Sequence, residues 1–552
     1  MAGKVGRSDS IRIKMSSDTL SRQKTPIWFW ILGLLLVGYV AACTGQRDNV
    51  LSADAWEHLR VLRALTHDLW HPGNPTFVSD LPSVRYSPYF VGLAVLCRNT
   101  GIDPYNALSA AAVVNMCLLV VAVWLLLAAF EEEGAAGAVL VVMISLWGAA
   151  PGYANSYALS DLPWHEVNPS AVGFPLVLLS WALLRRMAMR GWNGMEVAGL
   201  ILLITMANLE HGMTGAFGMA GLVIVGFFAP LEKRRLSVII AISVSICAGI
   251  LCMAWPWYSF LAAVRMHQDS AYWYNPYISK QMFTVWCVPA IVCGVFAIPL
   301  RDRPLVRISL AGAAVSLLIG LIGSLIHSAV LARFPLPGMI YLHMSIGIFA
   351  QRTEIFKLSS WPERFRSLMA PASEAAYPML QIVVSFAVLF FLAPQLVDSA
   401  VEPHLGRVYL TKILHLRNLQ QNVRQTFPDL LSPVGLRDVV LADPVTSWMI
   451  PAFRGRVVTA IHYELFVPGQ ANGAKAVDLF FSPTGTESQR EEIIRDYNVR
   501  WIALNPSMLS EEMMRSLGRQ TAVVRETSGM VLMSAPAWIA AGPKAVVNVQ
   551  TP

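Results

Sequence analysis

Long apolar runs decide the fold of this chain, and the clearest covers residues 106–130, NALSAAAVVNMCLLVVAVWLLLAAF. The run carries no charged side chain, and about 20 consecutive apolar residues let a helix cross a bilayer. Similar runs recur before and after it. Spanning helices are therefore predicted at 26–45, 106–130, 135–150, 171–187, 195–210, 213–229, 236–256, 284–300, 307–328, 338–351 and 377–397.

The overall composition agrees with a membrane protein. Hydrophobic residues make up 55% of the 552 positions, charged residues only 14%, and the mean hydropathy is +0.51. A soluble globular enzyme carries more charge and a disordered chain is less hydrophobic, so both classes are excluded. The sequence predicts a polytopic α-helical membrane protein with about eleven transmembrane helices.

The charge distribution predicts the orientation. The net charge is +7 and the isoelectric point is near 9.0, but the excess of Lys and Arg falls in the N-terminal tail and in alternate loops, as the positive-inside rule expects. Nucleic acid is therefore not implied. We expect an inner (plasma) membrane protein with a cytoplasmic N-terminus. One segment departs from the positive-inside rule, because the acidic run 131–133 falls on the inner side.

The chain divides into three parts. Residues 1–25 form a basic cytoplasmic tail, 26–397 the membrane domain with a long outer loop at 46–105, and 398–552 an extracytoplasmic α/β domain. In the last part the apolar segments shorten to strand length. Strands are predicted at 439–442, 457–461, 501–504, 523–524 and 530–533, and helices at 487–497 and 510–517.

One alternative concerns the first span. Val40-Ala-Ala-Cys43 resembles a bacterial lipoprotein cleavage box. The tail before the apolar run is long for a signal peptide, so we expect the helix to stay as an uncleaved anchor.

The first outer loop holds the best cluster of polar residues. Leucines at helical spacing predict a helix at 53–69, and a second interfacial helix is expected at 86–97. Asp54, Glu57 and His58 share one face of the first helix, where a carboxylate could accept the proton of an incoming hydroxyl while His58 orients it. The plainer interpretation is the solvated face of an amphipathic helix.

Two further outer segments also place a histidine beside a carboxylate. Asp161, His165 and Glu166 precede the fourth span, and Glu210 and His211 form the turn between the fifth and sixth. Such pairs could bind a divalent cation, for which Mg and Mn are the candidates, or contact substrate. Helix capping and loop hydrogen bonds are the alternative.

Cationic groups at the outer boundary could hold a lipid phosphate. The candidates for substrate binding are Arg85 with its neighbour Tyr86, Arg265, and Lys280 in a loop rich in aromatic residues. Ordinary snorkelling to anionic headgroups is the alternative for each of them.

The order of parts resembles the GT-C superfamily of integral-membrane glycosyltransferases, which includes protein mannosyltransferases, oligosaccharyltransferases and aminoarabinose transferases. The residues that carry this resemblance are Asp54-Ala-Trp-Glu57-His58, Pro72-Gly-Asn-Pro75, Tyr86-Ser-Pro88-Tyr and Gly101-Ile-Asp-Pro-Tyr-Asn-Ala-Leu. The tail resembles the outer domain of bacterial members through VVLADPVTSWMIPAFRGRVV (439–458) and REEIIRDYNVRWIALN (490–505).

The resemblance implies transfer of a sugar from a polyprenyl-phosphate carrier to a glycan, lipid or protein acceptor on the outer face. Asp54 matches the family's first-loop carboxylate, and Asp161 or Glu166 matches the acidic residue of the second loop. The family often shows a plain pair of acids, whereas here His58 is added, which leaves metal dependence open. Asp443 is expected to cap a turn. The other functions considered are a transporter or flippase for a lipid-linked or polar solute and a non-catalytic scaffold for cell-envelope assembly.

Overall fold

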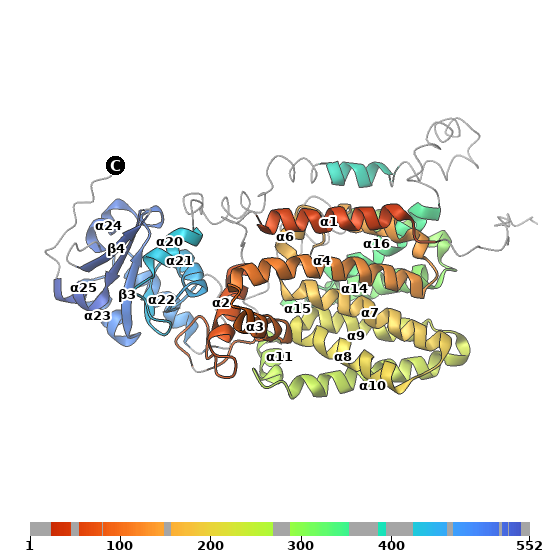
Figure 1. Ribbon diagram of the computed structural model, residues 1–552, viewed down its shortest axis with the longest axis horizontal. Coiled ribbons are helices and arrows are strands. Elements are labelled where there is room, and N and C mark those ends of the chain that lie inside the picture. Colours follow the sequence, from red (N-terminus) through yellow and green to blue (C-terminus); the bar gives the residue numbers. More distant parts are fainter. Residues whose placement is uncertain are drawn as a thin grey trace, which may run out of the picture.

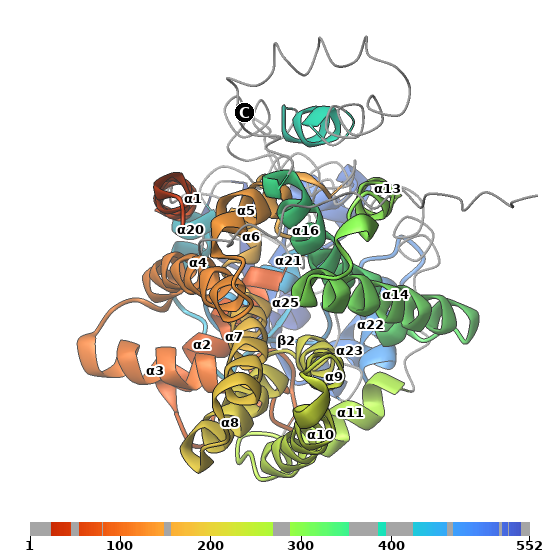
Figure 2. The ribbon, with the colours of Figure 1, turned by 90° about the vertical axis from the view of Figure 1, so that its right-hand side faces the viewer.

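The structure is a computed structural model in which an elongated helical bundle carries an α/β unit at one end (Figure 1). It describes residues 24–45, 54–79, 81–147, 156–268, 288–352, 383, 385–393, 423–460, 467, 469–517, 522–527 and 529–541. Seen along the long axis, α1 and several other bundle helices appear nearly end-on (Figure 2).

Five of the described helices are long and apolar enough to cross a membrane. They are α1 (Ile27–Gly45), α4 (Pro104–Ala129), α7 (Pro169–Arg190), α10 (Leu231–Met253) and α14 (Pro304–Leu325). All five coincide with predicted spans, so these predictions are confirmed as helices.

The remaining bundle elements are shorter. They are η1 (Glu133–Ala135), α5 (Ala136–Ser145), α6 (Leu162–His165), α8 (Gly194–Glu210), α9 (Gly212–Phe227), α11 (Phe260–Gln268), α13 (Val288–Val295), η4 (Ile298–Leu300), α15 (Ala329–Ala332) and α16 (Pro335–Arg352). The prediction of one continuous helix over 284–300 is wrong. After Val295 the chain turns and then forms the short 3-10 helix η4, which contains a proline. Of the run at 377–397, only 383 and 385–393 are described, as helix. The count of about eleven spans stays a prediction.

Local signals set where the spans begin. At α4, the carboxylate of Asp103 accepts the backbone N–H of Tyr105 at 2.9 Å and Pro104 occupies the first turn. A side-chain acceptor at the N-cap satisfies a donor that the helix leaves free, and proline fits a position whose N–H has no partner.

Close packing holds the bundle together, as at Trp181 in α7. Its ring stacks on Tyr341 of α16 at 5.0 Å, and its indole N–H donates to the carbonyl of Gly218 in α9 at 3.0 Å. A Cβ on Gly221 would come within 2.1 Å of the same ring. The small residues of α9 therefore allow the large ring to reach the centre.

At the bundle end away from the α/β unit, Glu132 joins three segments. Its carboxylate lies 3.5 Å from Arg303 before α14 and 3.1 Å from Arg352 at the end of α16. The side chain of Glu132 is only 4% exposed. The acidic run that departs from the charge rule thus has a structural use, because a buried carboxylate is tolerated when cations balance it.

The two helices expected in the first outer loop are present. They are α2 (Asp54–His67) and α3 (Pro88–Thr100), and α3 ends at Gly101, whose left-handed backbone (φ 71°) closes the helix. Both lie at the bundle end that carries the α/β unit, with α2 turned across the direction of the long helices (Figure 1). We call this the first-loop end.

The C-terminal unit contains all five expected strands, with boundaries shifted by a few residues. They are β1 (Val439–Leu441), β2 (Arg456–Val457), β3 (Val499–Leu504), β4 (Val523–Thr527) and β5 (Met530–Ser534). The sheet order is β2-β1-β3-β5-β4; β1 is parallel to β2 and β3, and the pairs with β5 are antiparallel.

Helices complete this C-terminal unit. They are α20 (Val423–Leu430), α21 (Pro444–Met449), η7 (Ile450–Ala452), α22 (Gln470–Phe480), α23 (Glu487–Asp496), η8 (Pro506–Met508), α24 (Glu511–Leu517) and α25 (Ala535–Ala541). The predicted helices at 487–497 and 510–517 are thus confirmed. The start of α23 is fixed by a reciprocal capping box between Thr486 and Gln489. Leu441, Ile502 and Trp538 are buried in the core of the unit.

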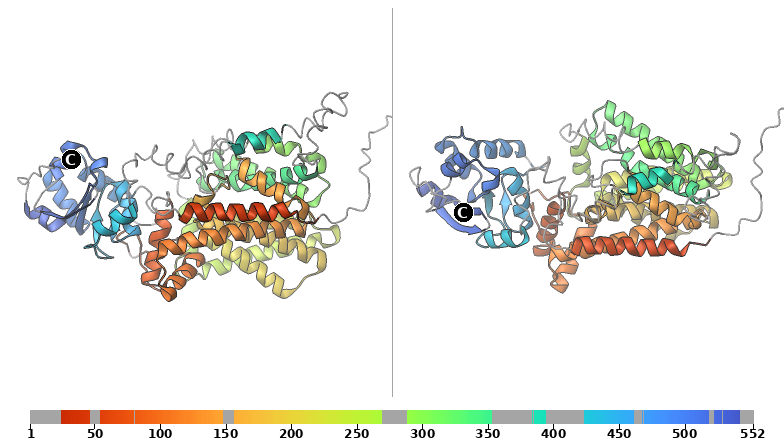
Figure 3. Two further views of the ribbon diagram at one scale, coloured as in Figure 1. Left: turned by 45° about the horizontal axis from the view of Figure 1, so that its top comes forward. Right: turned by 90° about the horizontal axis from the view of Figure 1, so that it is seen from above.

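The C-terminal unit is joined to the first loop by backbone as well as side chains, and Figure 3 shows it against this end of the bundle from two sides. The N–H of Val457 in β2 donates to the carbonyl of Thr76 at 2.7 Å, and Phe77 pairs with Val457 as an isolated parallel bridge. The rings of Trp56 and Phe453 meet at 5.7 Å. The first loop therefore extends the edge of the sheet.

Candidate functional site

The most constrained residue of α2 is Glu57, whose side chain is fully buried. Its carboxylate forms an ion pair with Arg85 and lies 3.7 Å from Arg60 on the next turn of the helix. The indole N–H of Trp448 in α21 donates to the same carboxylate at 3.3 Å. Glu57 therefore joins α2, the segment before α3 and the C-terminal unit in one buried contact.

His58 is also enclosed. Its side chain is 3% exposed, stacks on the ring of Phe90 at 5.2 Å and hydrogen-bonds the side chain of Asn168. Burial, reinforced by the positive charge of Arg85, lowers the pKa of His58 to about 3. The imidazole is thus neutral near pH 7 and is packed as part of the protein interior.

These positions correct one expectation. The interpretation of α2 as a surface helix with a solvated polar face is wrong for Glu57 and His58, because α3, α4, α21 and η7 cover the helix from several sides. Its residues from Ala55 to Leu62 are all buried. The sequence showed the helical spacing but not these partners.

Asp54 differs from its two neighbours in accessibility. It is the first residue of α2 and remains partly exposed, whereas Glu57 and His58, one turn further on, are buried. The structure thus separates a cluster that the sequence treats as one: a partly accessible carboxylate stands at the start of a helix whose next turn is fixed by ion pairs.

The candidates from the second outer loop are also buried. His165 is 1% exposed and Glu166 is fully enclosed, with His165 Nδ1 at 3.6 Å from Glu166 Oε1. Burial lowers the pKa of His165 to about 3 and raises that of Glu166 well above its usual value. Asp161, 4% exposed, accepts a hydrogen bond from the hydroxyl of Ser156.

Tyr89 of α3 connects the three outer segments. Its backbone N–H donates to the carboxylate of Glu210 at 2.8 Å, and its hydroxyl accepts from the side-chain amide of Asn115 at 3.1 Å. Asn115 also donates to the backbone carbonyl of Glu166 at 2.8 Å. The three outer segments therefore meet in one buried region, joined by these hydrogen bonds.

His211 serves as a helix cap. Its Nδ1 lies 2.7 Å from the hydroxyl of Thr214 and accepts the backbone N–H of the same residue at 3.3 Å, at the start of α9. This is the capping alternative considered from the sequence. Asp443 likewise caps α21, since its carboxylate accepts the N–H groups of Val445 and Thr446 at 3.0 Å each.

The cationic candidates and Tyr86 differ in exposure and in how much of each residue the structure describes. The side chain of Arg85 is 31% exposed while it pairs with Glu57, and Tyr86 is fully buried with its hydroxyl donating to the carbonyl of Gly73 at 2.7 Å. Arg265 belongs to α11 at the first-loop end, and only its backbone is described. Lys280 lies outside the described residues.

Metal binding has no support in the described ranges. Among these residues no group of three His, Cys, Asp or Glu side chains is arranged to hold an ion. Of the first-loop candidates, Asp54 and Arg85 are the partly exposed ones among the residues that the structure describes.

Trp448 and Phe453 were not identified as site residues from the sequence. Trp448 donates to Glu57. The ring of Phe453 contacts the ring of Trp56 and the guanidinium of Arg63, whose Cζ is 5.8 Å from the Phe453 ring centre. The only local signal was their place in the quoted 439–458 segment, which carries no indication of a partner almost 400 residues earlier.

The chain was compared with known proteins. No protein-family model matches the sequence, and no curated protein matches it. The structure is similar to ArnT from Cupriavidus metallidurans in the apo state, with 12% identity, 93% of this chain and 98% of that chain covered, and a TM-score of 0.49.

Two further solved structures are similar to this chain at comparably low sequence identity. ArnT bound to undecaprenyl phosphate shares 12% identity, with 95% and 99% of the two chains covered and a TM-score of 0.49. The apo oligosaccharyltransferase of Archaeoglobus fulgidus shares 11% identity, with 87% and 70% covered and a TM-score of 0.45.

Proposed function

We propose that this protein is a GT-C-type glycosyltransferase that moves a sugar from a polyprenyl-phosphate carrier to an acceptor on the outer face of the membrane. The observation that carries the proposal is the division within α2. Asp54 is partly exposed at the start of the helix, while Glu57 anchors the following turn to Arg60, Arg85 and Trp448. The sequence resemblance matches Asp54 to the family's first-loop carboxylate.

In the proposed reaction, the Asp54 carboxylate accepts the proton of the acceptor hydroxyl. The freed oxygen forms a bond to the anomeric carbon of the donor sugar while the bond from that carbon to the carrier phosphate breaks. The phosphate leaves with the bonding electrons and stays attached to the lipid. No redox partner is needed, and the proton remains on Asp54 until it passes to water.

The buried contacts of Glu57 fix α2 and so give the Asp54 carboxylate its position. A catalytic group is effective only when its geometry is fixed by neighbours that do not themselves move. Glu57 and His58, both enclosed, are therefore positioning residues in this proposal, and Asp54 is the catalytic residue. This revises the part expected for the two neighbours from the sequence.

The leaving phosphate needs a positive charge at the depth of the lipid headgroups. Arg85 fits this requirement, since its side chain is partly exposed beside Glu57. Arg265 and Lys280 stay predicted phosphate contacts. A polyprenyl tail keeps the donor in the bilayer, which agrees with a site placed at one end of a bundle of apolar helices.

The test is sugar transfer in membranes supplied with a panel of radiolabelled polyprenyl-phosphate sugars. Wild type is compared with Asp54→Asn at matched expression, and with Asp68→Asn as the control. Asp68 follows α2 and accepts the backbone N–H groups of Trp70 and His71 at 3.1 and 2.9 Å. An asparagine oxygen can accept the same bonds, so the control makes the same chemical change away from the proposed base.

Label transferred by wild type and Asp68→Asn but not by Asp54→Asn would support both the enzyme class and the base. Equal transfer by all three proteins would show that Asp54 is not the catalytic residue. A wild type that transfers no sugar from a panel covering the common polyprenyl-phosphate sugars would contradict the proposed reaction.

A further inference from the structure

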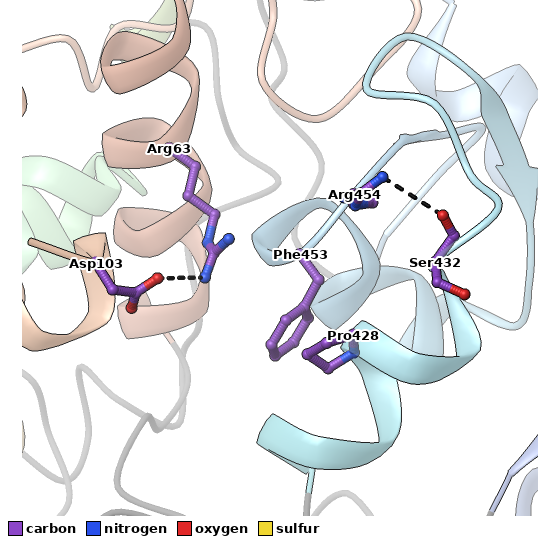
Figure 4. A pocket seen from close by; sticks show the side chains of 6 residues that line it. All are labelled: Arg63, Asp103, Pro428, Ser432, Phe453 and Arg454. Atoms are coloured by element: carbon purple, nitrogen blue, oxygen red, sulfur yellow. Dashed lines mark hydrogen bonds and ion pairs between the residues drawn. The ribbon is translucent and has the colours of Figure 1, made fainter. Parts of the chain in front are cut away.

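A pocket of about 320 Å³ lies between the first loop and the C-terminal unit. Figure 4 shows the side chains that line it, which come from α2, the start of α4, α20, the loop after α20 and the segment after η7. They are Arg63, Asp103, Pro428, Ser432, Phe453 and Arg454. The volume is within the range that encloses a small organic molecule.

This pocket is separate from the proposed catalytic carboxylate. Arg63 stands nine positions after Asp54 on the same helix, which is about 14 Å along its axis and on the opposite side. The residues of the pocket therefore do not meet a sugar held at Asp54. The transfer reaction proposed above therefore gives the residues of the pocket no role.

The pocket carries a net positive charge. Arg63 and Asp103 form an ion pair at 3.4 Å, and their side chains are 32% and 42% exposed. The second arginine, Arg454, is exposed and reaches the carbonyls of Ser432 and Val434 at 3.5 Å, the outer limit of a hydrogen bond. The lining thus contains two guanidinium groups and one carboxylate.

The remaining walls are apolar. Phe453 and Pro428 line the pocket between the two arginines (Figure 4). The guanidinium of Arg63 lies over the Phe453 ring, an arrangement that holds the charged group in place. A guanidinium is suited to carboxylate and phosphate, and an aromatic wall is suited to the face of a ring.

We propose that this pocket binds a ring-bearing organic anion, with its carboxylate or phosphate held by Arg63 and Arg454 and its ring against Phe453 and Pro428. Because one arginine belongs to the first loop and the other to the C-terminal unit, a bound anion ties the two together. The anion has two sources, a soluble sugar acid or sugar phosphate and the headgroup of an anionic lipid. The inference does not rest on the proposed transfer reaction.

The experiment measures binding to the full-length chain in neutral detergent at constant ionic strength. The probes are D-glucuronate and D-glucose 6-phosphate, with D-glucose as the uncharged match, and the readouts are calorimetric titration and the melting temperature. Both anions are expected to bind saturably and to raise the melting temperature, and glucose is expected to do neither.

Three charge variants make the test specific. Arg454→Gln should weaken anion binding about tenfold or more, because a charge-assisted contact is lost. Asp103→Asn should strengthen it several-fold, because it removes the one negative charge while asparagine still caps α4. Arg515→Gln is the control, since Arg515 is exposed on the same unit and pairs with Glu511, outside the pocket.

The two sources are separated in nanodiscs of neutral lipid with and without phosphatidylinositol, an anionic lipid whose headgroup carries a ring. Displacement of the soluble anions by phosphatidylinositol supports a lipid headgroup in the pocket, and undiminished binding supports a soluble anion. The proposal is overturned if wild type binds neither anion, or if Arg454→Gln and Asp103→Asn bind them as Arg515→Gln does.

Discussion

Trp448 donates its indole N–H to the carboxylate of Glu57 at 3.3 Å, although 391 positions separate the two residues. Glu57 is fully buried and Trp448 is 2% exposed. A buried carboxylate is stable only when charges and donors surround it, and here one donor comes from the C-terminal unit. The unit therefore completes the environment of α2 as well as covering it.

The contact predicts the effect of Trp448→Phe, which keeps an aromatic side chain, smaller than the indole, and removes the donor. We expect a loss of about 1.5–3 kcal/mol in the free energy of unfolding, because the acceptor is charged and enclosed. A lower melting temperature in detergent would show this. Sugar transfer should also fall at temperatures where the variant is folded, since α2 is held less firmly.

Trp538→Phe provides the matched control for that variant. Trp538 is buried in the same unit and donates to the backbone carbonyl of Leu517 at 2.8 Å. Its replacement should lower the melting temperature by a smaller amount and leave transfer intact. An equal loss of transfer in both variants would contradict a positioning role for Trp448.

A second prediction separates Glu57 from Asp54. Glu57→Gln removes the charge that balances Arg60, whose side chain is 1% exposed, and should cost about 3–5 kcal/mol. Asp54→Asn should leave the melting temperature almost unchanged and abolish transfer. Yield and melting temperature of both variants test this contrast. A stable Glu57→Gln protein would mean that Glu57 does not anchor the helix.

The third prediction concerns pH. The pKa of His58 is lowered to about 3 from an ordinary value of 6.5, because the imidazole is buried beside Arg85. The unfolded chain therefore binds a proton that the folded chain does not, and the stability that depends on neutral His58 is lost as pH falls from 6.5 toward 3. The slope is about 1.4 kcal/mol per pH unit.

His58→Gln should reduce this slope when melting temperatures are measured between pH 7 and 5. Glu166 changes the free energy of unfolding in the opposite direction with pH. Because burial raises the pKa of its carboxyl, the stability contributed by protonated Glu166 weakens as pH rises above 4.5. The comparison of variant with wild type cancels the effect of Glu166. Parallel curves for the two proteins would show that His58 does not titrate between the states.

The fourth prediction applies to the far end of the bundle. Glu132→Gln leaves Arg303 and Arg352 without their shared carboxylate and should lower the melting temperature, at a cost of about 1–3 kcal/mol. Glu131→Gln is the control, because no ion pair between that neighbour and either arginine is found in the described part of the chain. Similar melting of the two variants would argue against the three-segment junction.

The sequence by itself determined many of the helices and all five strands of this protein. Apolar length predicted the five helices long enough to span a membrane, the leucine spacing predicted α2, and short apolar segments predicted the strands. The capping role of Asp443 was expected, and capping by His211 was one of two alternatives; both are local, because a cap bonds backbone within three residues. Each of these signals is local, so each can be read without knowing the fold.

Only the tertiary structure decided which polar residues of α2 are accessible. Asp54, Glu57 and His58 share a helical face by spacing, yet the last two are enclosed by Phe90, Asn168 and Trp448, which come from other elements. The same holds for the pocket between Arg63 and Arg454. Burial and ion pairing depend on distances between segments far apart in the chain, and helical or strand periodicity carries no information about them.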